Sequence, residues 1–188
     1  MVRAIVIIAG LGLLVSDACA ELDLTPVDSF YEVEGIRVPN VTFRNGAKDV
    51  TYTPPPRWAL CGRGKKLTLT PPNTIQAGAT MQAITAKNAP PATPENLKAY
   101  SELALELVPR EAANVEVVET VICPLRISGQ PLVEATLNYV FFGQQFRMNV
   151  LFLSREKEQM RFQFSSRAAD FPPLLKTFRT SLYSMQGL

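Results

Sequence analysis

The sequence contains no histidine. This absence excludes Ser-His-Asp triads and Cys-His pairs, because both need an imidazole to activate the nucleophile. It also excludes every metal site with an imidazole ligand. The few cysteines cannot build a four-cysteine zinc site and form no C-x-x-C pair. We therefore predict a non-enzymatic protein without cofactor, metal or catalytic residue.

Charge of either sign is also scarce, since charged residues make up 19% of the chain and the formal net charge is only +2. A nucleic-acid-binding protein would be expected to carry a basic footprint, so we predict no nucleic-acid partner. The hydrophobic fraction of 47% is that of an ordinary globular chain. No long apolar run follows the N-terminal one, which predicts a mature chain without a transmembrane span.

The N-terminus carries a run typical of export. Arg3 precedes an apolar stretch over residues 4–15, and Ala18 and Ala20 then form an A-x-A cleavage site. The pattern predicts a signal peptide over residues 1–20 and a mature protein that is periplasmic or extracellular.

A bacterial lipoprotein signal is the alternative interpretation of the same segment. It would place a lipid anchor on Cys19, but the charged Asp17 fits poorly near a modified cysteine. The sequence therefore favours soluble export and cleavage after Ala20.

Two cysteines, Cys61 and Cys123, remain after cleavage. An even number in an exported chain suggests a disulfide, whereas two buried thiols are the alternative, and the sequence leaves both open. Cys123 alternates with Val121 and Leu125, so its side chain is expected on a buried face of a sheet.

Residues 21–56 predict an N-terminal β-hairpin extension. Turns are expected at Glu34-Gly35 and Asn45-Gly46, because glycine and asparagine tolerate the positive φ angles of tight hairpins. The prolines at 54–56 cannot donate ladder hydrogen bonds, so we place a domain boundary there and assign residues 57–188 to one α/β domain.

This second part predicts two short strands around a Gly62-Arg63-Gly64 turn and a third strand over residues 80–86. A helix over residues 94–108 follows, with Thr93 as its N-cap. Four alternating runs between residues 115 and 164 predict an antiparallel meander, and an amphipathic helix is expected from Asp170 onward. The first run is expected to place its apolar residues on one face: Val115, Val117, Val121, Cys123, Leu125 and Ile127. The fold class is α+β.

The order of these elements and the ending "RFQFSS…F…L…F…SL" resemble the PsbP-like fold. This α/β/α sandwich occurs in the photosystem extrinsic subunit, the Ran-binding Mog proteins and DcrB-type bacterial envelope proteins. The resemblance implies an accessory or interaction module of the bacterial envelope with a protein partner. It carries no catalytic motif.

Two alternative functions stay open. A small apolar ligand, such as a lipid, could occupy the space between the sheet and its helices. A carboxylate-based hydrolase would need a carboxylate pair, and Glu102 and Glu106 lie four residues apart on the predicted helix, on its polar side. Basic residues between Arg147 and Arg179 would form a mild positive surface if exposed together, although scattered solubilising charge is the simpler interpretation.

Overall fold

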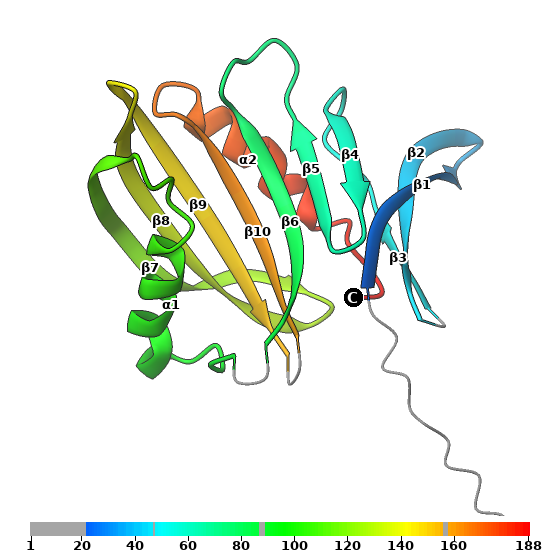
Figure 1. The fold of residues 1–188 in the computed structure, drawn as a ribbon. Coiled ribbons are helices and arrows are strands. Elements are labelled where there is room, and N and C mark those ends of the chain that lie inside the picture. The colour runs from blue at the N-terminus through cyan, green and yellow to red at the C-terminus, as the bar shows by residue number, and fades with distance from the viewer. Residues whose placement is uncertain (1–21, 47, 87–88, 156–157) are drawn as a thin grey trace, which may run out of the picture.

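The structure is a computed structural model that describes residues 22–188, except 47, 87–88 and 156–157. The predicted signal peptide, its cleavage site and Cys19 lie outside the described residues. The described chain forms a three-stranded sheet, a seven-stranded sheet and two α-helices (Figure 1). All strand pairs are antiparallel, which confirms the predicted α+β class with antiparallel sheets.

The three-stranded sheet contains β1 (Leu22–Val33), β2 (Ile36–Asn45) and β3 (Lys48–Tyr52) in sequence order. Both predicted hairpins are confirmed: Val33 pairs with Ile36 across the Glu34-Gly35 turn, and Asn45 pairs with Lys48. Gly35 has a φ of 79°, in the left-handed region that glycine adopts without steric cost.

The seven-stranded sheet has the order β4-β5-β6-β10-β9-β8-β7. Its first strands are β4 (Ala59–Arg63), β5 (Lys66–Thr70) and β6 (Gly78–Thr85). Gly62 and Arg63 belong to β4 instead of the predicted turn, which lies at Gly64 and Lys65. The remaining strands form the predicted meander: β7 (Ala113–Ile127), β8 (Gln130–Phe141), β9 (Gln144–Ser154) and β10 (Glu158–Arg167).

The predicted first helix begins as a 3-10 turn, η1 (Pro94–Asn96), and continues as α1 (Leu97–Leu105). Thr93 is the N-cap of η1. The terminal helix is α2 (Phe171–Leu182), with Pro172 and Pro173 confined to its first turn, as expected for residues that lack a backbone donor. No helix in the described part of the chain is long and apolar enough to cross a membrane.

The two helices cover opposite faces of the seven-stranded sheet. Tyr100 and Ala104 of α1 pack with Phe152 and its neighbours in one apolar core. Phe178 and Leu182 of α2 belong to a second core. Figure 1 shows α2 behind β6 and β10, whereas α1 lies on the viewer's side below β7 and β8. The meander is therefore apolar on both faces, because each face has a helix to cover it.

The prediction that β7 presents all its apolar residues on one face is wrong. Val117 packs with the α1 core, whereas Cys123, Leu125 and Ile127 belong to the α2 core. The register of the β7–β8 pair shifts between Val117 and Glu119. An extra residue in one strand moves every later side chain to the opposite face, so a strict alternation read from the sequence fails at this bulge.

The N-terminal sheet is packed onto the domain that follows it. Phe43, Val50 and Tyr52 lie in the same core as Phe178. The Tyr52 hydroxyl hydrogen-bonds with the Ser181 hydroxyl of α2 at 2.7 Å. The predicted boundary at residues 54–56 thus separates two sheets that share one core.

Candidate functional site

Most of the β1–β2 hairpin is a ribbon of only two strands. β3 pairs with β2 over Val41–Asn45, so residues 27–40 have no third strand beside them. In Figure 1 this end of the hairpin projects away from the seven-stranded sheet. Isolated two-stranded ribbons are marginally stable in water, so a projecting ribbon needs a further contact to be well ordered.

One face of this ribbon carries four exposed apolar residues. Val27, Tyr31 and Val33 alternate along β1, and Ile36 lies directly opposite Val33 on β2. Their exposed fractions are 51%, 44%, 49% and 67% respectively. We call these four residues the hairpin face. Single exposed apolar residues are normal on proteins, but several together on one face mark an interaction surface.

The opposite face of the ribbon is partly covered by its own side chains. The guanidinium of Arg37 lies 4.0 Å from the centre of the Phe30 ring, and Arg37 is paired across the strands with Glu32. Arg37 covers part of the Phe30 ring through a cation–π contact, Phe30 remains 55% exposed, and this face carries charge. The hairpin face carries no charged side chain and no cation–π contact, and the Ser29–Asn40 hydrogen bond lies between Val27 and Tyr31 on it. It is the candidate binding surface of the two.

The hairpin face continues into a groove against α2. Tyr31 lines a pocket of about 650 Å³ together with the proline run at 54–56. The other wall comes from α2 and the residues after it: Pro173, Lys176, Thr177, Thr180, Ser181 and Ser184. We call this pocket the hairpin groove. Its proline and tyrosine wall offers apolar contact, and its hydroxyls offer hydrogen-bond donors and acceptors.

A buried polar cluster lies beneath α2. Glu134 of β8 is 6% exposed and accepts a hydrogen bond from Arg179 Nη1 of α2 at 2.7 Å. Asn149 of β9 donates to the same Glu134 oxygen at 2.7 Å and to the Thr136 hydroxyl at 3.1 Å. Asn149 Oδ1 is buried without a hydrogen-bond partner among the described residues. The cluster anchors α2 to β8, because removing Arg179 would leave the Glu134 carboxylate buried and unpaired, whereas the Arg179 side chain is itself 30% exposed.

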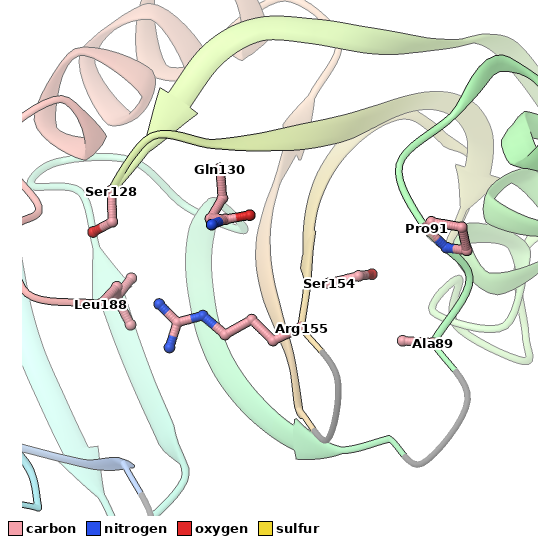
Figure 2. Close-up of a pocket in the computed structure, with 7 residues that line it drawn as sticks. All are labelled: Ala89, Pro91, Ser128, Gln130, Ser154, Arg155 and Leu188. Atoms are coloured by element: carbon pink, nitrogen blue, oxygen red, sulfur yellow. The ribbon is translucent and has the colours of Figure 1, made fainter.

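A further pocket of about 640 Å³ lies at one end of the seven-stranded sheet (Figure 2). Figure 2 shows Arg155 extending from the end of β9 toward Ser128 and Leu188, with Ala89 and Pro91 on the other side. Two of its lining residues, Ala89 and Arg155, come directly next in the sequence to residues that the structure does not describe. We assign it no role.

The two predicted disulfide cysteines are not brought together. Cys61 is on β4 and Cys123 on β7, the two opposite edges of the seven-stranded sheet, and both are free thiols. An intramolecular bond needs neighbouring strands, so this fold does not form it. The expected burial of Cys123 is confirmed, since it is 3% exposed. Burial raises the pKa of the Cys123 thiol.

The carboxylates Glu102 and Glu106 are both exposed at the α1 end of the molecule, away from the buried cluster.

The sequence did not predict the hairpin face or the Glu134–Arg179 pair. A signal existed for Glu134, because it is the only charged residue of β8 and stands between the apolar Val133 and Ala135. Arg179 gave no such signal, because it lies on the polar side of α2 with Lys176. Nothing in the sequence indicates that the two lie side by side.

Comparisons with known proteins assign no family. Neither a family model nor a curated protein matches the chain. Among solved structures, the chain is similar to a protein of unknown function from Pseudomonas aeruginosa, PA94, described as a putative regulator. The TM-score is 0.45 and the identity 11%, over 81% of this chain and 92% of that one. A structure from Bacteroides thetaiotaomicron also has a TM-score of 0.45, with 6% identity over 74% of this chain and 45% of that one.

Proposed function

We propose that this protein is an exported, non-enzymatic binding module that holds a partner protein on its hairpin face. The observation that carries the proposal is the exposed apolar surface of Val27, Tyr31, Val33 and Ile36 on a ribbon of two strands. A partner that covers this face removes apolar area from water and adds a layer to the ribbon, so it stabilises the ribbon as it binds.

The partner that this surface fits best is an extended apolar segment of another protein. In its sheet, β1 is the terminal strand and pairs only with β2 among the described residues. Its register with β2 shifts between Asp23 and Val27, and from Val27 onward its outer edge offers backbone donors and acceptors. An added strand would use these groups, and its side chains would reach the hairpin face and the hairpin groove. Half-exposed side chains of this size gain about 1 kcal/mol each on burial.

Export and the PsbP-like fold are parts of the same proposal. The N-terminal pattern around Arg3, Ala18 and Ala20 supports export. The order of strands, helix, meander and terminal helix supports the resemblance to PsbP-like accessory proteins. An N-terminus at Glu21 in protein taken from its source would agree with export, and acyl chains on Cys19 would instead identify a lipoprotein.

The alternative of an apolar-ligand carrier has less support. The space between the sheet and its helices is filled by buried side chains, among them Tyr100 and Phe152 on one side and Phe164 and Phe178 on the other. Native mass spectrometry of protein from its own source tests the carrier directly, since a retained lipid would favour it over the binding module.

The binding proposal is tested with a photo-crosslinking amino acid at Ile36 in the protein's own organism. We expect a crosslink to a different protein, and we expect Tyr31→Ser to reduce its yield about fivefold, equivalent to about 1 kcal/mol of binding free energy. The matched control carries the crosslinker at Ile75, which is 74% exposed on the loop between β5 and β6.

Three outcomes would contradict the proposal. The first is a crosslink at Ile36 that persists unchanged in Tyr31→Ser, and the second is the same protein captured equally from Ile75. The third is a crosslinked dimer of this chain, which would assign the hairpin face to self-association.

A further inference from the structure

A second pocket lies on the other flank of α2 and is lined by three cations. Arg147 of β9 forms one wall, and Lys176 and Arg179 of α2 form the other. Phe171, Leu175 and Tyr183 complete its apolar surface, and its volume is about 480 Å³. We call it the cationic pocket. No acidic residue lines it among the described residues.

Two uncharged side chains, Asn138 and Phe171, orient the guanidinium of Arg147. Its Nε donates to Asn138 Oδ1 at 2.8 Å, and its guanidinium carbon lies 5.6 Å from the centre of the Phe171 ring. These contacts orient the guanidinium, and within the described residues no hydrogen bond engages its two terminal nitrogens. Within the described residues neither Arg147 nor Lys176 forms an ion pair.

Two carboxylates lie nearby and reduce the local charge in part. Glu134 pairs with Arg179 and neutralises that cation. Glu116 lines the adjoining pocket on the other side of Arg147 and is not ion-paired with it. Arg147 and Lys176 therefore give the cationic pocket a net positive charge.

We propose that the cationic pocket binds an oxyanion, a phosphate or carboxylate group, carried on a flat apolar body. A guanidinium presents two parallel donors that match the oxygens of such a group, and the lysine adds a point charge. Pro172, Leu175 and Tyr183 supply apolar contact for the rest of the ligand. The volume lies within the usual range for small-molecule sites.

The cationic pocket differs from the hairpin groove in the ligand proposed for it, an oxyanion instead of a protein segment, and in the residue that tests it, Arg147. Lys176 and Thr180 line both pockets, because they lie on the exposed ridge of α2 between them. Arg147 lines the cationic pocket and not the hairpin groove, so its substitution tests this proposal alone.

The probe is phenyl phosphate, titrated into the full mature chain by calorimetry at low and at physiological salt. We expect saturable binding that weakens at high salt, because exposed charges are screened. Arg147→Gln should weaken binding at least about tenfold, and Arg147→Lys should recover part of the loss. Arg110→Gln is the control, since Arg110 is exposed on the loop between α1 and β7.

A second arm distinguishes the source of the oxyanion with phosphatidylcholine vesicles, with and without phosphatidylglycerol. Arg147-dependent binding of both phenyl phosphate and anionic vesicles supports a lipid headgroup as the ligand. Arg147-dependent binding of phenyl phosphate alone supports a soluble ligand.

The absence of saturable phenyl phosphate binding would overturn the proposal, and so would equal binding by wild type and Arg147→Gln. If Arg147→Gln fails to fold in a urea-unfolding control, Arg147→Lys takes its place, and phenyl phosphate binding that equals wild type in that variant would overturn the proposal.

Discussion

At the scale of single residues, burial gives the same side chain different properties in different places. Cys123 lies under α2, where Arg179 Nη2 is 3.5 Å from its sulfur, whereas Cys61 is exposed on the edge strand β4. Burial dominates over the nearby arginine and raises the pKa of the Cys123 thiol, so less of it is the reactive thiolate at a given pH. Two cysteines that look equivalent in the sequence should therefore react differently.

We expect iodoacetamide at mildly alkaline pH to modify Cys61 in the folded protein and to leave Cys123 unmodified. Cys123 should react only after denaturant exposes it, at a rate comparable to that of Cys61. Peptide mass mapping of each cysteine before and after unfolding provides the measurement. Equal rates in the folded state would contradict the burial of Cys123, and thiols that react only after reduction would show a disulfide.

At the scale of elements, the packing of β1 in the small sheet against β4 in the large sheet depends on one glycine. A Cβ added to Gly62 of β4 would meet the carbonyl oxygen of Leu24 and lie 2.8 Å from Leu67 Cδ1 and 2.9 Å from Pro26 Cδ. Beside it, the Leu24 amide donates to the Gly64 carbonyl at 2.5 Å. Only a residue without a side chain lets β1 approach β4 this closely.

Gly62→Ala should lower the free energy of unfolding by about 2 kcal/mol or more, because backbone on one side and packed side chains on the other leave no room for a methyl group. Gly78→Ala is the matched control. Its added Cβ would lie 3.5 Å from the Leu69 carbonyl oxygen, an ordinary contact, so we expect a much smaller change. Urea unfolding of both variants measures the difference, and equal effects would show that β1 does not pack on β4.

At the scale of the whole molecule, the shared core predicts that the two sheets unfold together. Phe43 and Tyr52 of the small sheet belong to the same apolar cluster as Trp58, Phe164 and Phe178. The single tryptophan stacks on Phe178, with ring centroids 6.4 Å apart and an interplanar angle of 9°. Trp58 therefore reports on the centre of this core.

We expect tryptophan fluorescence and far-ultraviolet circular dichroism to give coincident unfolding transitions. Phe43→Ala, in the small sheet, should shift both by the same amount, with a loss of about 3 to 5 kcal/mol. Ile75→Ala, at a residue 74% exposed, should stay within about 0.5 kcal/mol of wild type. A dichroism transition that moves without the fluorescence transition would mean that the small sheet unfolds on its own.

Local chemistry accounts for what could be predicted from the sequence. The turn at Glu34-Gly35, the proline run that ends the small sheet, and the prolines in the first turn of α2 all follow from the backbone freedom of single residues. The alternation of the meander and the spacing of the last helix follow from side-chain periodicity. These features depend only on neighbours along the chain. The sequence by itself therefore determined the helices, the strands and the α+β class.

The tertiary structure alone decided the rest. A bulge in β7 moved Cys123 to the face opposite Val117, and the strand order put Cys61 and Cys123 at opposite edges of one sheet. The pairing of Glu134 with Arg179, and the placement of Arg147 across from Lys176, join residues far apart in the sequence. Such contacts arise from the packing of one element on another, and periodicity within an element carries no information about them.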